Sequence, residues 1–178
     1  MKCLRLDNGG EYCIKEFDDY YSYHGIRREK IVPGTPQENG VSERMNMTIM
    51  EGARSRRLHA GFPLQFKANA IDTAVYLINI GPSSSLYGRI PEVEWIEKKV
   101  NYSFLKTFGC EAFVHIDKEN RTKLEAKSKK CTFIGYGVND FGYCLWDYEN
   151  HKIIRSRDFI FNEKVMYKDK LQGKIQEK

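Results

Sequence analysis

The sequence predicts a chain in two parts, an α/β part followed by a small all-β part. In residues 1–82, short apolar runs alternate with segments that have helical periodicity. After Phe104 the apolar runs are short, aromatic or β-branched, and Gly, Asn and Asp separate them. We therefore predict a linker at 83–103, a second domain at 104–167 and a frayed polar tail at 168–178.

The first part opens with a strand, a helix and a second strand. Lys2–Leu6 is a short apolar run that ends at Asp-Asn-Gly-Gly, and Ile26–Val32 is a second strand candidate. Between them, Ile14–His24 has aromatic residues at helical spacing, and Gly25 stands where a helix C-cap is expected. Because a helix connects the two strands, we expect them to be parallel.

Two longer helices are expected next. From Val41 the apolar residues follow a helical stripe, with Asn39 and Gly40 expected to cap the helix start. Gly61-Phe62-Pro63 breaks the chain, and a second periodic helix runs from Leu64 to about Gly81.

The last part carries five predicted strands with turn residues between them. Strands at such close spacing are typical of a small β-barrel, which we expect to fold by itself. The five strands are 108–116, 131–136, 143–148, 153–156 and 159–161. Their aromatic residues are interpreted as barrel core; a stacking platform for single-stranded nucleic acid is the alternative.

Composition sets broad limits on function. The 178 residues are 41% hydrophobic and 30% charged, which is typical of a globular protein, and their net charge is +5. That charge fits either simple solubility or attraction to a polyanion. The segment 118–130 contains six basic residues and two acidic ones, which makes a DNA-backbone contact a hypothesis for this segment.

The cysteines predict free thiols rather than a zinc site. Five cysteines are scattered along the chain without Cys-x-x-Cys spacing: Cys3, Cys13, Cys110, Cys131 and Cys144. Free thiols fit a reducing compartment, and the sequence has neither a signal peptide nor an apolar run of membrane-spanning length. We therefore expect an intracellular protein without membrane contact, cytoplasmic or nuclear.

Two short motifs and their spacing indicate a family. Asp7 lies within Leu-Arg-Leu-Asp-Asn-Gly-Gly-Glu-Tyr, and Glu43 lies within Thr-Pro-Gln-Glu-Asn-Gly-Val-Ser-Glu-Arg. Together with later motifs, they make the chain resemble the integrases of Ty1/copia-type retrotransposons, in the same order over residues 1–165. The later motifs include Phe108-Gly109-Cys110, Phe133-Ile134-Gly135-Tyr136 and Arg155-Ser156-Arg157-Asp158.

The resemblance implies a fold, a reaction and partners. Residues 1–82 would be the C-terminal part of an RNase H-like catalytic core, and residues 104–167 an SH3-like barrel. Asp7 and Glu43 would be the second and third acids of an Asp-Asp-Glu site that binds Mg²⁺ or Mn²⁺ for polynucleotidyl transfer. The partners would be retroelement ends and target DNA, and other integrase chains or a second copy of this chain. The residues expected to contact DNA are Asn39, Gly40, Arg44, Arg54, Arg57, Lys123, Lys127, Lys129 and Lys130.

The chain also departs from the family pattern. The family's first catalytic Asp lies on an earlier strand, and only six residues precede Asp7 here, so we expect no catalysis by this chain alone. The family's zinc module has no counterpart either. Two alternatives to an integrase fragment stay open: a non-catalytic DNA- or protein-binding module, and a decayed retroelement product with no role.

Overall fold

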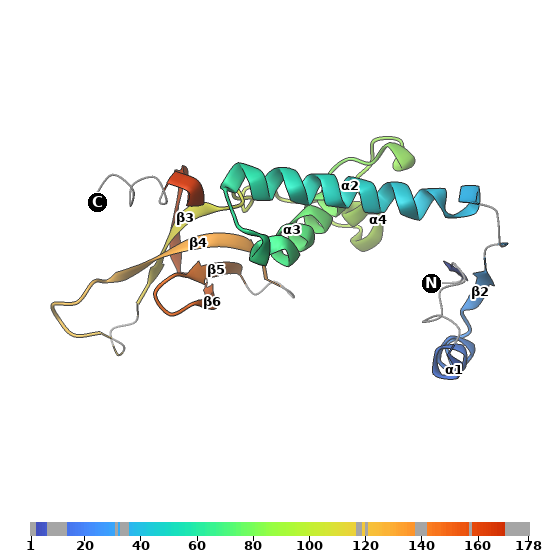
Figure 1. The fold of residues 1–178 in the computed structure, drawn as a ribbon, viewed down its shortest axis with the longest axis horizontal. Coiled ribbons are helices and arrows are strands. Elements are labelled where there is room, and N and C mark those ends of the chain that lie inside the picture. The colour runs from blue at the N-terminus through green and yellow to red at the C-terminus, as the bar shows by residue number, and fades with distance from the viewer. Residues whose placement is uncertain are drawn as a thin grey trace. The chain divides into compact units, whose positions relative to one another are not determined.

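The computed structural model describes residues 3–6, 14–30, 32, 36–116, 119, 121–137, 142–156 and 158–169, with only the backbone described at 36–39 and 156. The chain forms two compact units, Met1–Thr48 and Ile49–Lys178. Figure 1 shows the helices and strands of both units. No helix within the described ranges is long and apolar enough to span a membrane.

The first unit begins with the predicted strand, helix and strand. They are β1 (Cys3–Leu6), α1 (Lys15–Tyr23) and β2 (Arg27–Lys30). β1 and β2 pair in parallel, from Cys3 opposite Arg27 to Leu6 opposite Lys30, which confirms the predicted crossover. Gly25 ends α1 with a φ of +61°, a conformation that glycine adopts without steric cost.

The helix α2 (Pro36–Ala60) begins at Pro36 rather than at Val41. Proline suits the first position of a helix because its fixed φ is already helical. Asn39 and Gly40 consequently lie inside the helix, so the prediction that they precede and cap it is wrong. Near its C-terminal end, Ala53 and Ala60 are buried in the core of the second unit.

The helical part of the second unit continues with a short 3₁₀ turn, η2 (Leu64–Phe66), and the helix α3 (Lys67–Ile80). Both match the second predicted helix. The segment that follows contains a second 3₁₀ turn, η3 (Ser84–Leu86), and the short helix α4 (Pro91–Ile96).

A five-stranded antiparallel sheet completes the second unit, and all five predicted strands are present in it. The strand order is β6-β5-β4-β3-β7. The strands are β3 (Cys110–His115), β4 (Ser128–Tyr136), β5 (Tyr143–Asp147), β6 (Lys152–Ser156) and β7 (Phe159–Met166). Of these, β7 extends well beyond the predicted end at Phe161.

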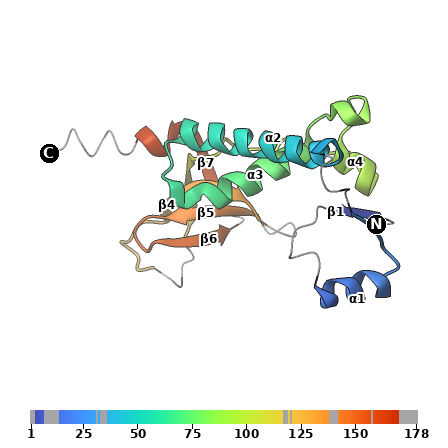
Figure 2. The ribbon, with the colours of Figure 1, turned by 45° about the vertical axis from the view of Figure 1, so that its right-hand side comes forward.

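Helices and sheet share one hydrophobic core. α3 lies along β4, as Figures 1 and 2 both show. The ring of Phe66 meets Trp146 of β5 edge to face, with 5.4 Å between centroids, and the ring of Phe62 lies 5.4 Å from Phe108. Phe133 is fully buried, so the interpretation of the aromatic residues as core is confirmed there. Close approach is possible because Gly109 has no side chain: a Cβ at this position would lie 2.3 Å from the Cβ of Ala60.

The shared core changes the expectation for the barrel. Residues from α2, η2 and α3 cover strand residues in a single cluster, so the linker predicted at 83–103 separates segments that pack together. The expectation that 104–167 folds by itself therefore lacks support, because isolating it would expose this apolar face to water. The predicted domain boundaries at 82 and 104 stay a prediction.

Substitution of Phe66 tests whether the helices stabilise the sheet. Phe66 is 4% exposed, and we expect Phe66→Ala to cost about 3–5 kcal/mol of unfolding free energy because it leaves a cavity against Trp146. Leu64→Ala is the matched control, since Leu64 lies in the same 3₁₀ turn and is 72% exposed; its cost should stay within about 0.5 kcal/mol. Urea unfolding followed by circular dichroism measures both, and equal midpoints for the two variants would contradict the shared core.

Candidate nucleic-acid interface

Of the two predicted acidic residues, Glu43 lies within the described part of the structure. Glu43 lies on an exposed stretch of α2, next to Arg44, which is also exposed. Asp7 lies outside the described residues, so its pairing with Glu43 stays a prediction. Within the described ranges, no group of three or more His, Cys, Asp or Glu side chains is arranged to hold a metal ion. A single exposed carboxylate does not make a Mg²⁺ site, since this ion needs several oxygen ligands in an octahedron.

Two of the predicted DNA contacts lie near the C-terminal end of α2. Arg54 is exposed. Arg57 is half-buried, and its Nη1 donates a hydrogen bond of 2.7 Å to the carbonyl oxygen of Phe62, just beyond the helix end. A cation at this place also compensates the negative end of the helix dipole. Arg57 therefore has a structural role, while Arg54 has the more accessible charge.

The loop before β4 presents two lysines to solvent. Lys123 and Lys127 are both exposed, and neither has an ion-pair partner in the part of the chain that the structure describes. The loop is ordered around them, because Thr122 N donates to Glu125 Oε2 at 2.6 Å and Arg121 Nε donates to Ile116 O at 3.1 Å. Exposed ammonium groups on an ordered loop suit contact with a phosphate backbone.

Lys129 and Lys130 are already paired with carboxylates. Lys129 Nζ lies 2.8 Å from Asp147 Oδ2 and 3.1 Å from Glu149 Oε2. Lys130 Nζ lies 2.8 Å from Oε1 of Glu111, whose side chain is buried. As neighbours on β4, the two lysines belong to opposite faces of the sheet. Their charges compensate buried acids, so their part in DNA binding has weaker support than that of Lys123 and Lys127.

Asp147, like Glu111, is a buried acid that the sequence did not lead us to expect. Its side chain is 0% exposed and accepts hydrogen bonds from Glu149 N at 3.0 Å and from Asn150 Nδ2 at 2.8 Å. Burial raises the pKa of Asp147, but the hydrogen bonds from Lys129 and Asn150 outweigh burial and lower that pKa to about 2. A turn signal was present in the sequence, because Asp147 is followed three residues later by Asn150 and both residue types favour turns.

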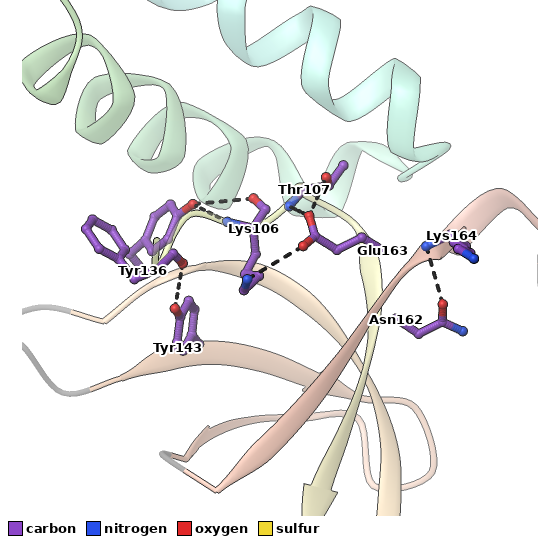
Figure 3. Close-up of polar contacts among 8 residues, drawn as sticks. Lys106, Thr107, Tyr136, Tyr143, Asn162, Glu163 and Lys164 are labelled. Carbon is purple, nitrogen blue, oxygen red and sulfur yellow. Dashed lines mark hydrogen bonds and ion pairs between the residues drawn. The ribbon is translucent and has the colours of Figure 1, made fainter. Parts of the chain in front are cut away.

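A second network fastens the segment before β3 to the sheet. The hydroxyl of Tyr136 accepts a hydrogen bond from Lys106 N at 3.2 Å and donates one to Lys106 O at 3.3 Å, and Tyr143 donates to Phe104 O at 2.5 Å. On β7, Glu163 Oε2 accepts from the backbone N–H and the hydroxyl of Thr107 (Figure 3). Burial raises the pKa of Tyr136 to about 12. Strands β4, β5 and β7 therefore hold this segment in one conformation.

Comparison with known proteins agrees with the motifs seen in the sequence. The family model of the retroviral polymerase SH3-like domain matches residues 110–175, which include all five strands of the sheet. The second unit is thus an SH3-like domain with helices packed on it. The chain belongs to the family of retrovirus-related Pol polyproteins of plant copia-type transposons, which confirms the resemblance seen in the sequence.

The relatives are much longer than this chain. The Pol polyprotein from transposon TNT 1-94 of Nicotiana tabacum is 58% identical over 163 residues, which are 92% of this chain and 12% of that polyprotein. The Pol polyprotein from transposon RE2 of Arabidopsis thaliana is 37% identical over 90% of this chain and 11% of its own length. One chain in a solved structure of the simian T-cell lymphotropic virus intasome, in complex with PP2A regulatory subunit B56 gamma, has a TM-score of 0.45. It is 14% identical and covers 90% of this chain and 57% of that chain, a likeness too weak to establish a common fold.

The lowered pKa of Asp147 makes stability depend on pH in a defined window. Between about pH 4 and pH 2 the unfolded chain binds a proton at this carboxyl that the folded chain does not, so stability falls as pH falls. The loss from this group should be about 2 kcal/mol, and Asp147→Asn should remove that part of the pH dependence. Urea unfolding between pH 6 and pH 2.5 measures it. Glu149→Gln, at a residue whose side chain is 81% exposed, is the control and should keep the slope; an unchanged slope in Asp147→Asn would contradict the assignment.

Proposed function

We propose that the chain is the integrase region of a copia-type Pol polyprotein and serves DNA integration. The observation that carries this proposal is the 58% identity to a transposon Pol polyprotein over 92% of the chain. The chain spans only 12% of that relative, so the activity of the whole polyprotein is part of the proposal.

The proposal assigns Asp7 and Glu43 as two of the metal-binding carboxylates of an RNase H-like core. The parallel pair β1 and β2, connected through α1, and the exposed position of Glu43 on α2 support this assignment. When bound, Mg²⁺ or Mn²⁺ would polarise the phosphodiester and stabilise the charge that develops on it. Asp7 and Glu43 would contribute two carboxylates, whereas the family's site has a third carboxylate, from another Asp.

A polypeptide of these 178 residues should therefore show no strand transfer on its own with Mg²⁺ or Mn²⁺ and a retroelement-end duplex. A longer chain that includes the preceding Pol segment should be active, and Glu43→Gln in that chain should lower the rate at least about 10³-fold, since the carboxylate acts through the metal. A gel assay of joined products measures both. Strand transfer by the 178 residues alone, or full activity with Glu43→Gln, would refute the assignment.

We further propose that the SH3-like unit binds duplex DNA through its basic surface without sequence preference. Lys123 and Lys127 carry the proposal because both are exposed and neither is paired in the described structure. Arg54, also in the second unit, is exposed as well and would add to the charge, while the exposed Arg44 of the first unit stays a separate proposed contact. Binding of this kind releases counterions, so it weakens steeply with salt.

The double substitution Lys123→Gln and Lys127→Gln tests this interface. We expect it to weaken DNA binding severalfold and to reduce the slope of log K against log salt concentration by roughly 2, because two phosphate contacts are lost. Fluorescence anisotropy with a labelled duplex, at several salt concentrations, measures both quantities. The double substitution Lys98→Gln and Lys99→Gln removes the same charge from another exposed segment and serves as control. Equal effects of the two pairs would indicate net charge rather than an interface.

A non-catalytic binding module is the second candidate. The single core that unites helices and sheet in the second unit favours it, since such a unit is expected to stay folded independently of any catalytic site. Two results together would support this candidate. The Glu43→Gln chain should bind DNA with unchanged affinity, and DNA integration in the host should not depend on the chain. An unfolded and rapidly degraded product would instead indicate a decayed reading frame.

A further inference from the structure

A groove of about 800 Å³ lies between α3 and the sheet of the second unit. Its first wall is one face of α3, where Asn69, Asp72, Tyr76 and Asn79 recur at helical spacing. Its floor is formed by β4 and β5, and the side chains of Ile153 and Arg155 on β6 lie on its other side. None of the residues proposed for DNA contact lines it.

The polar side chains of this groove are available for a ligand. Asn69, Asp72, Asn79 and Arg155 have no side-chain hydrogen bond or ion pair with any residue that the structure describes. Asp72 and Arg155 bring opposite charges to two sides of the groove, and both residues are exposed. The groove therefore offers one acidic site, one basic site and two amide groups.

The tyrosines that line the groove are held by contacts with other residues. The rings of Tyr76 and Tyr136 pack with centroids 4.5 Å apart, and the hydroxyl of Tyr136 is held by the backbone of Lys106. Tyr143, which also lines the groove, is bonded to Phe104 O. A preformed site of this kind does not have to be ordered when a ligand binds, which favours affinity.

We propose that this groove binds an extended peptide segment of a partner protein that has a basic residue facing Asp72 and an acidic residue facing Arg155. A side-chain amide has an acceptor and two donors, which match the two polar groups of a peptide unit. Asn69 and Asn79 are separated by ten residues of α3, or about 15 Å along its axis, a length that about five residues of extended peptide span. The two amides would thus hold the main chain, and the two charges would select its side chains.

The lining favours peptide over single-stranded nucleic acid. Its charged residues are one acid and one base, whereas a strand of phosphates needs a groove with net positive charge. The ring of Tyr136 is also packed against Tyr76, with 4.5 Å between the centroids. Because the groove and the basic loop share no residue, peptide binding does not depend on the proposed DNA contacts.

The experiment selects binders from a displayed library of random eight-residue peptides against the full 178-residue chain. We expect recovered peptides to share a basic and an acidic position. Their affinity, measured by fluorescence anisotropy, should fall about tenfold with Asp72→Asn and with Arg155→Gln. The controls are Glu51→Gln on α2 and Lys152→Gln on β6, two residues that do not line the groove and should have little effect.

A charge exchange separates recognition from a fold defect. The double variant Asp72→Arg, Arg155→Asp should prefer peptides in which the basic and acidic residues are swapped, and should bind the original peptides at least about tenfold more weakly. Failure to recover any peptide, or affinities that do not respond to Asp72→Asn, would overturn the proposal. So would a labelled oligothymidylate whose binding is lost with the groove variants, since the groove would then serve nucleic acid.

Discussion

The second unit depends on the packing of Phe62 and Phe66 between the helices and the sheet. These rings meet Phe108 and Trp146, and Tyr167 after β7 packs on Phe62 with centroids 4.6 Å apart. Burial of such rings contributes several kcal/mol each, more than any exposed ion pair on the surface. The contact places α3 along β4, and that placement creates the groove. A single apolar interface thus joins the helices to the sheet and positions the groove between them.

The basic residues of the sheet and its loop differ in whether an acidic side chain is paired with them. On β4, Lys129 and Lys130 neutralise the buried carboxylates of Asp147 and Glu111, which would be costly to bury alone. In the preceding loop, Lys123 and Lys127 are exposed and have no acid to compensate within the described structure. The same residue type therefore stabilises the fold in one place and supplies free charge in another. Net charge alone would not separate these roles.

The residues proposed to bind DNA and the residues that line the groove are different parts of one chain. Family membership rests on identity to transposon Pol polyproteins, and the SH3-like match covers the sheet. DNA attraction would use exposed lysines on the loop before β4, while the groove has balanced charge and two side-chain amides without a partner among the residues that the structure describes. A domain that binds DNA on one surface and a peptide on another would connect a nucleic-acid substrate to a protein partner. Because the basic loop and the groove share no residue, substitutions can abolish DNA binding or peptide binding separately.

Local patterns in the sequence were sufficient for much of the fold. Alternating apolar residues and the turn residues between them predicted all five strands, and Gly25 predicted the end of α1, because both signals act over a few residues. The start of α2 was misplaced, since Pro36 is compatible with either a turn or a first helical position. The sequence by itself determined the strands, the family resemblance and the presence of a basic segment. Only the tertiary structure decided which lysines are free, that residues 49–80 share the core of the sheet, and that α3 and β6 border one groove. Ion pairs and packing between residues far apart in the chain leave no periodic signal, so they exist only once the fold brings their partners together.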